Sequence, residues 1–216
     1  EDEISKWFQE RRTDAKVFFY IETIEESLVT YVKSNNITEI QNVNATMEEV
    51  LQHFLEDLAM YKYIAILDEN GTCIQIEENE GEISPVTEGA DLSQGGYHTN
   101  ITTNVNNPDF EYLGTIRRTF IAGSSDLIAA TASAIYDEAN FDENNPSDSY
   151  VGQIVLFIDL DVIFEIMNQA SGLGNTGEAY IVNKDLYWLT PSKYTEYYSG
   201  LGYDDIQDTI LAEQIT

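Results

Sequence analysis

Few side chains in this sequence are suited to acid–base or nucleophilic catalysis. The chain has two histidines, His53 and His98, and one cysteine, Cys73. Both kinds of catalysis need a titratable or nucleophilic group held beside a suitable partner, and His53 falls inside a predicted helix, where a structural role is simpler. Carboxylates are so numerous that no pair of them stands out as a catalytic dyad. We therefore predict that the chain is not an enzyme and holds no cofactor.

An acidic segment between residues 137 and 149 carries the oxygen ligands that calcium prefers. Its acidic and amide side chains include Asp137, Glu138, Asp142, Glu143, Asn144 and Asp148. Their spacing does not follow the EF-hand pattern, because a loop that starts at Asp142 departs from it at the fifth and sixth positions, from Pro146 onward. We interpret this segment as a solvated acidic loop and predict no metal site, with calcium binding as the alternative.

Two adjacent arginines are candidates for binding an anionic group. Arg117 and Arg118 are the only cations between Lys62 and Lys184, and both fall within a predicted strand. Strand alternation sends one of them inward and the other outward. One interpretation is that they pair with nearby carboxylates at the surface. The other is that Arg117 binds an anionic group of a ligand, which a planar guanidinium does well.

Charge excludes one class of partner. The 216 residues include 39 acidic and 10 basic residues, so the formal net charge is −29. Such a chain repels a phosphate backbone, and nucleic acid is therefore excluded as a partner. With 43% hydrophobic residues, the chain can bury one sizeable core or two modest ones. Strong acidity fits a solvated exterior or a salty habitat.

Several features fit the exterior of a cell. The lone Cys73 excludes an intrachain disulfide framework. The longest apolar run, Ile154–Ile158, is far shorter than the roughly 20 residues that a membrane span needs. Asn-x-Thr triplets, which are glycosylation acceptors in exported chains, begin at Asn36, Asn44, Asn70 and Asn100. We expect an extracellular portion of a longer membrane protein, without its membrane anchors.

Two helices are predicted before the first glycine. A stripe with spacings of four and three residues comprises Val17, Ile21, Ile24, Leu28 and Tyr31. Traced back to Trp7, it predicts a helix of about 30 residues, roughly 45 Å long, that ends near Asn35-Asn36. This helix either packs on its own core or also serves as a stalk or dimer helix. A second helix is predicted to begin at Thr46, with Glu49 completing a capping box.

The pattern then changes to strands. Tyr63–Leu67 and Thr72–Ile76 flank the turn signal Asn70-Gly71 and predict an antiparallel hairpin. A loop-rich stretch, Glu77–Asp109, follows. Three further strands are predicted at Tyr112–Ile121, Leu127–Tyr136 and Tyr150–Ile158, before a helical period returns after Asp159. This order predicts an α+β fold with an antiparallel five-stranded sheet flanked by helices.

The sequence pattern of the first hairpin recurs near the end of the chain. Ala179–Leu186 repeats the apolar strand and polar turn of Tyr63–Gly71. The segment Gly174–Asp185 resembles the opening hairpin of the membrane-proximal lobe in double Cache sensor domains. The Gly89–Ser93 segment and the Val151-Gly152 strand fit the same family in the same order. The resemblance covers nearly the whole chain and implies a pair of PAS-like lobes outside the membrane.

The resemblance also implies a division of the chain. Residues 1–45 would form the long N-terminal helix and its connection, 46–170 the distal ligand-binding lobe with its linking helix, and 171–216 the start of an incomplete membrane-proximal lobe. In this family small molecules usually bind in the distal lobe. The candidate ligand-binding residues are Tyr97, His98, Arg117, Tyr136 and Asp159. Gly95 stands where members that bind amino acids place an arginine.

We therefore expect the small-molecule sensing domain of a transmembrane receptor, most simply a two-component sensor histidine kinase, with a chemoreceptor also compatible. Its expected partners are a small-molecule ligand, its own transmembrane and cytoplasmic signalling domains, and a second copy in a weak homodimer. The alternative is a surface adhesion or structural module of an acidic, salt-adapted cell.

Overall fold

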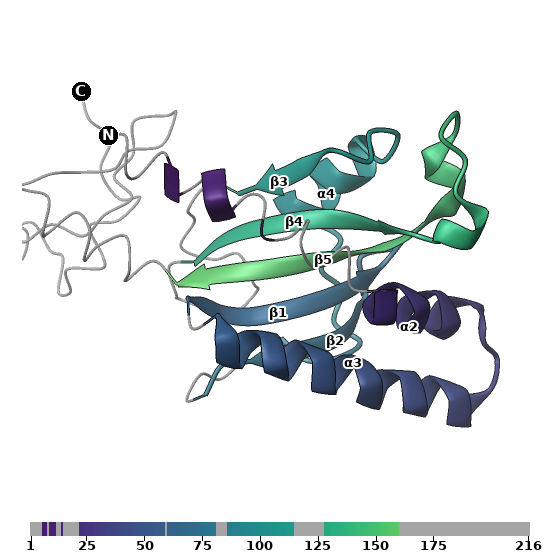
Figure 1. Ribbon diagram of the computed structural model, residues 1–216, viewed down its shortest axis with the longest axis horizontal. Helices are drawn as coiled ribbons and strands as arrows, with labels where there is room; N and C mark the ends of the chain where they lie inside the picture. The colour runs from purple at the N-terminus through teal and green to yellow at the C-terminus, as the bar shows by residue number, and fades with distance from the viewer. Residues whose placement is uncertain are drawn as a thin grey trace, which may run out of the picture.

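The computed structural model describes residues 6–7, 9–11, 14, 22–58, 60–80, 86–114 and 128–159. Its centre is a five-stranded sheet in the order β2-β1-β5-β4-β3, in which all neighbouring strands are antiparallel (Figure 1). The strands are β1 (Tyr61–Asp68), β2 (Cys73–Glu78), β3 (Glu111–Leu113), β4 (Ile128–Tyr136) and β5 (Tyr150–Asp159). The predicted α+β class with a five-stranded antiparallel sheet is confirmed.

The strands that come first and last in the sequence, β1 and β5, pair with each other at the centre of the sheet. Ala65 of β1 lies opposite Val155 of β5, which in turn lies opposite Ala132 of β4. The central part of β5, from Val151 to Ile158, is buried throughout. An apolar strand that is buried on both faces needs covering elements on both sides of the sheet.

Helices α2 (Glu22–Lys33) and α3 (Ile37–Asp57) lie on one face of the sheet, and α3 runs alongside β1 and β2 (Figure 1). The predicted end of the first helix near Asn35-Asn36 is confirmed, because α2 ends at Lys33. Residues 6–7, 9–11 and 14 are helical as well, whereas residues 15–21 lie outside the described part.

The start predicted for the second helix is wrong. Asn36, not Thr46, is the N-cap of α3, and its side-chain oxygen accepts the Thr38 N–H at 3.1 Å. The Thr46 hydroxyl instead donates to the Asn42 carbonyl inside the helix, at 3.0 Å. Thr and Asn are both good N-cap residues. Asn35 and Asn36 precede Thr46 in the chain, and the new helix begins directly after them. The apolar face is confirmed, since Met47, Leu51 and Leu55 are buried.

Glycine allows α2 to approach the sheet closely. A Cβ atom at Gly152 of β5 would lie 2.2 Å from the Leu67 carbonyl oxygen and 3.0 Å from Cδ2 of Leu28. The first distance is far inside van der Waals contact, so a larger residue there would separate strands β1 and β5 and displace α2.

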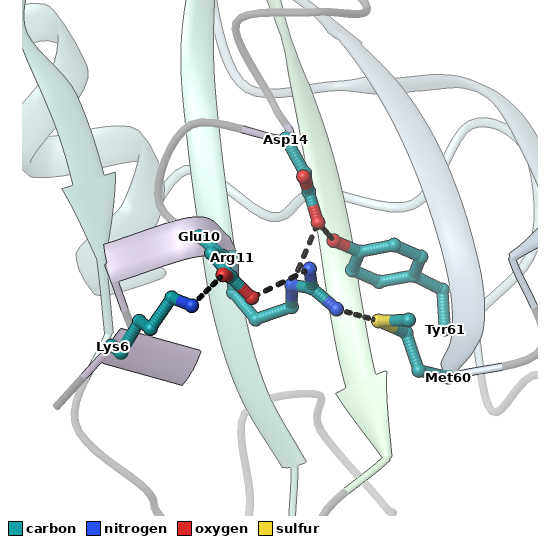
Figure 2. A network of polar contacts seen from close by, with 6 residues as sticks. All are labelled: Lys6, Glu10, Arg11, Asp14, Met60 and Tyr61. Atoms are coloured by element: carbon teal, nitrogen blue, oxygen red, sulfur yellow. Dashed lines mark hydrogen bonds and ion pairs between the residues drawn. The ribbon is translucent and has the colours of Figure 1, made fainter. Parts of the chain in front are cut away.

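A polar network ties the described N-terminal residues to the start of β1 (Figure 2). The Arg11 guanidinium pairs with Asp14 at 2.8 Å, and it also donates to the sulfur of Met60. The Tyr61 hydroxyl donates to the same Asp14 carboxylate, and burial raises the pKa of Tyr61. Trp7 lies 5.6 Å from the Arg11 guanidinium in a cation–π contact. The N-terminal segment is thereby anchored beside the sheet.

The hairpin β1–β2 is confirmed, and its turn has Gly71 at a φ of 83°, a left-handed conformation that favours glycine.

The stretch Glu77–Asp109 is less irregular than predicted. It contains helix α4 (Gly96–Thr103) on the other face of the sheet, beside β3 and β4 (Figure 1). Segment 89–92 also pairs with the outer edge of β2, through the Cys73 N–H to the Ala90 carbonyl at 2.9 Å.

Three predictions fall on residues outside the described part: the second half of the Tyr112–Ile121 strand, the linking helix after Asp159, and the partial second lobe at 171–216. The division into domains stays a prediction. Within the described residues, no helix combines the length and the apolar character that crossing a membrane requires.

Candidate ligand-binding face

The face of the sheet under α4 carries three of the five expected site residues. Tyr97 and His98 lie on α4, in a segment that was predicted as loop, and Tyr136 ends β4. Tyr97 is 1% exposed, His98 7% and Tyr136 1%, and all three line or border the same buried layer. We name this surface, formed by α4 and the side chains of β1, β4 and β5 beneath it, the α4 face.

Helix α4 has a sequence of low helical propensity, Gly-Tyr-His-Thr-Asn-Ile-Thr-Thr. Its polar side chains bond back to carbonyls of the preceding turn: Thr99 to Gly95 at 3.2 Å, Asn100 to Gly96 at 2.7 Å and Thr103 to Thr99 at 2.7 Å. Such bonds compensate poorly for weak propensity. The burial of Tyr97 and Ile101 against the sheet therefore decides that this segment is helical.

Beneath α4 the sheet presents a column of small side chains. Residues opposite one another in register form three rows across β1, β5 and β4: Leu67, Gln153 and Ala134; Ala65, Val155 and Ala132; and Tyr63, Phe157 and Ala130. All the β4 members are alanine. Because alanine occupies little volume, α4 and its large side chains can lie close to the sheet.

Aromatic rings fill one end of this face. Phe157 contacts Tyr97 edge to face at 5.7 Å between ring centroids, and it contacts Tyr63 in the same manner at 6.2 Å. Rings in this geometry add to the stability that burial alone gives. Burial also raises the pKa of Tyr97 to about 12, so its hydroxyl is neutral across the physiological range.

The other end of the α4 face is polar. Nδ1 of His98 lies 3.2 Å from Oε1 of Gln153, and the Tyr150 hydroxyl donates to the same oxygen at 3.3 Å. Burial lowers the pKa of His98, which favours the neutral ring. A neutral ring that donates from Nδ1 leaves its Nε2 as an acceptor.

Gln153 is fully buried, and its Nε2 has no hydrogen-bond partner within the described part of the chain. The amide can be turned over, so that Nε2 faces His98 and Tyr150, but Oε1 is then the unpaired atom. In either orientation one amide atom lacks a partner among the described residues. A buried polar atom without a partner costs about 1–3 kcal/mol, and a water or a bound molecule commonly supplies the partner.

Tyr136 connects the α4 face to the segments at its edge. Its hydroxyl donates to the Val105 carbonyl, just after α4, at 2.8 Å. Its ring contacts Phe141 at 5.5 Å and Tyr150 at 6.2 Å, both edge to face. Burial raises the pKa of Tyr136 to about 12. Tyr136 thus holds the end of α4 to the acidic segment that follows β4.

Of the two remaining candidates, the structure describes only the backbone of Asp159 and does not describe Arg117. Asp159 is the last residue of β5, opposite Ile128 of β4, and its side chain lies outside the described part. Arg117 lies outside it as well. Three candidates are therefore brought to one face, while the roles of all five stay predictions. Sequence reasoning missed Gln153, although it is the one polar residue within the apolar strand segment Val151–Ile158.

Two open clefts lie elsewhere. One, of about 430 Å³, lies between the end of α3 and the end of β2, and is lined by Gln52, Leu55, Glu56, Glu78, Asn79 and Glu80. The other, also about 430 Å³, is lined by Ile76, Glu78, Val86, Thr87 and Glu88. Both have carboxylate rims, and neither is lined by any of the five expected residues.

The acidic segment after β4 forms two short 3-10 helices, Glu138–Asn140 and Pro146–Ser149. Two of its carboxylates have protein partners: Asp137 accepts from Lys33 and from Asn140, and Asp142 accepts the Asn144 N–H at 2.9 Å. Among the described residues, no three His, Cys, Asp or Glu side chains are grouped in a way that could hold a metal ion.

Comparisons with known proteins identify the fold. No family model and no curated protein match the chain. Among solved structures, the chain is similar to the extracellular domain of the histidine kinase vpHK1S-Z8, with 14% identity and a TM-score of 0.56 over 98% of this chain and 72% of that one. The sensor domain of the V. cholerae histidine kinase DctB gives 11% identity and a TM-score of 0.56 over 98% and 73%. The chain shares the fold of these two domains.

A chemoreceptor shares this sensor-domain fold. The ligand-binding domain of Campylobacter jejuni Tlp3, solved with 4-methylisoleucine, gives 11% identity and a TM-score of 0.53 over 90% of this chain. This chain spans 64% of that domain. The expected PAS-like fold of extracellular sensors of kinases and chemoreceptors is thereby confirmed.

Proposed function

We propose that this chain is the extracellular sensing domain of a transmembrane signalling receptor, and that it binds a small molecule at the α4 face. The observation that carries the proposal is the sensor-domain fold, shared with domains of histidine kinases and of a ligand-binding chemoreceptor. The buried amide atom of Gln153 that lacks a partner among the described residues supports the α4 face as the site, because a ligand there would meet an unused hydrogen-bonding group.

The parent receptor in this proposal is a sensor histidine kinase, since both neighbours matched over 98% of this chain belong to such kinases. The domain itself does no chemistry. A ligand changes the output only if it binds one arrangement of the domain better than another. The helices that precede the sheet would carry that change toward the membrane.

The ligand class follows from the neighbours and from one departure. Tlp3 was solved with isoleucine and with L-valine. In this chain Gly95 stands where amino-acid-binding members of the double Cache family place an arginine, and Gly95 is the N-cap of α4. Arg117 is the proposed charged contact, and Tyr97 the proposed aromatic wall. We therefore propose a small organic molecule outside the usual amino-acid pattern.

A thermal-shift screen of amino acids, other carboxylates, amines and neutral metabolites tests this function. The screen uses the parent, Tyr97→Ala and Arg117→Ala, with Tyr31→Ala as the matched control, because Tyr31 packs against the opposite core. We expect a ligand that stabilises the parent and Tyr31→Ala but stabilises at least one site variant less. A strong ligand whose shift survives both site substitutions would rule out the site, and a screen with no ligand would favour the structural module.

We also propose that the intact receptor pairs through its N-terminal helix, whose apolar stripe approaches the 3.5-residue period of paired helices. Ile24 and Leu28 of that stripe are buried in the core of the domain itself, so the pairing should be weak. Sedimentation should show mainly monomer at micromolar concentration and dimer only when the fragment is concentrated. A tight dimer formed through the sheet would contradict this.

A further inference from the structure

One buried carboxylate on α2 contacts the turn that follows β4. Glu25 is only 8% exposed, and its Oε1 accepts the backbone N–H of Glu138 at 2.9 Å. Glu138 opens the first 3-10 helix of the acidic segment. The contact joins residues that are 113 positions apart in the sequence, so it depends on how α2 is docked.

A second contact holds the same turn about two helical turns further along α2. Lys33 pairs with Asp137, and Asp137 also accepts the Asn140 side-chain amide at 2.7 Å. These bonds lower the pKa of Asp137, with Lys33 as the first cause. Helix α2 therefore contacts residues 137 and 138 at two points. Lys33 forms an ion pair with Asp137, and the Glu25 carboxylate accepts the peptide N–H of Glu138.

The charges around Glu25 are unfavourable within the described residues. Glu26 on its own helix and Asp137 and Glu138 on the turn repel it, and Lys33, the cation at the end of α2, is bonded to Asp137. Helix α3 and strand β5 pack against this part of α2 with apolar side chains, including Met47, Leu51 and Ile154. Burial, then Glu138, Asp137 and Glu26, raise the pKa of Glu25, although the Glu138 N–H opposes them.

The same turn reaches the α4 face through the preceding residue. Tyr136 bonds to the end of the α4 segment, while Asp137 and Glu138 bond to α2 on the opposite face. Three consecutive residues therefore contact both layers that cover the sheet. A change in the grip of α2 on this turn can displace elements on either side.

We propose that Glu25 and the 137–138 turn form a proton-responsive latch, which holds α2 against the sheet more firmly as the surrounding solution becomes acidic. A protonated Glu25 keeps its contact with the Glu138 N–H but no longer repels three neighbouring carboxylates. Its role as a regulator of receptor output rests on the proposed extracellular location. The latch itself does not depend on a ligand.

The test compares Glu25→Gln with Glu26→Gln, each of which removes one carboxylate from α2. In the first variant the new amide retains an oxygen for the Glu138 N–H and all three repulsions are removed. Glu26→Gln, at an exposed position of the same helix, removes the same formal charge but only the weakest of the three repulsions, and so controls for the change in net charge. Amide hydrogen exchange of α2, corrected for intrinsic rates, is measured for both variants and the parent at about pH 7.5 and about pH 5.

At the higher pH, α2 amides in Glu25→Gln should be protected at least about threefold more than in Glu26→Gln. At the lower pH the differences among the two variants and the parent should shrink, because the protonated fraction of Glu25 rises as the pH falls toward its raised pKa. Equal protection of the two variants at both pH values would overturn the proposal. So would a difference that persists unchanged at the lower pH. The ligand screen is a separate measurement, so either proposal can fail alone.

Discussion

The two faces of the sheet are covered in different ways. The α2/α3 face is packed with aliphatic side chains from two long amphipathic helices, among them Leu28, Met47 and Leu51. The α4 face has one short polar helix over an alanine column, with aromatic rings and a buried Gln153. Close aliphatic packing stabilises a fold without preparing it to bind. Unpaired polar atoms within an aromatic layer cost stability, which proteins retain mainly where the group has a function.

The largest effect should come from the α2/α3 face. Leu51→Ala removes a fully buried side chain and should lower the free energy of unfolding by about 2–5 kcal/mol. Glu48→Ala, an exposed change on the same helix, should alter it by less than about 0.5 kcal/mol. Urea denaturation measures both. If Leu51→Ala weakens ligand binding as much as Tyr97→Ala does, the distinction between the two faces is incorrect.

On the α4 face, Gln153→Leu should lower the free energy of unfolding by about 1 kcal/mol. Buried His98 and half-buried Tyr150 lose a shared acceptor, and removal of the unpaired amide atom of Gln153 offsets part of that cost. A double-mutant cycle with His98→Phe separates this pairing from simple packing. We expect a coupling of about 1 kcal/mol by chemical denaturation. Additive effects would show that His98 and Gln153 do not interact.

A smaller effect distinguishes the two possible starts of α3. Asn36→Ala removes the side chain that caps the helix and should cost about 1 kcal/mol. Thr46→Ala removes only a bond to a carbonyl within the helix and should change stability by less than about 0.5 kcal/mol. Thermal unfolding compares them, and the opposite ranking would restore the predicted start at Thr46.

The smallest effects are those of pH, and the two faces should respond with opposite sign. Burial lowers the pKa of His98 below its usual 6.5, so the stability that it contributes is present above about pH 6.5 and is lost as pH falls through the lowered pKa. The pKa of Glu25 is raised above its usual 4.5, so its contribution is present below that value and is lost as pH rises through the raised pKa.

Comparing the parent with His98→Gln from about pH 8 to about pH 5 checks the first half of this prediction. The stability advantage of the parent should shrink as the solution becomes acidic. An advantage that grows would mean that the charged form of His98 is stabilised on folding, with Asp68 and Asp91 as the carboxylates that favour it.

Local patterns predicted the strands and helix faces well. The sequence correctly predicted the hairpin of β1 and β2, the strands β4 and β5, and the apolar stripe of α3. Periods of 2 and 3.6 residues place apolar side chains on one side of a strand or a helix, so they can be recognised without the fold. The start of α3 was misplaced because Asn36 and Thr46 both offer a capping oxygen, and sequence alone ranks them poorly.

The sequence by itself determined the α+β class, the antiparallel hairpin and the apolar face of α3, since these depend on the alternation of residues a few positions apart. Only the tertiary structure decided that Gly96–Thr103 is a helix, that His98 meets Gln153, and that Glu25 meets the turn at Glu138. Each of these outcomes depends on residues far apart in the chain. Their energies come from burial and from unpaired polar groups, which exist only once the sheet has brought the segments together.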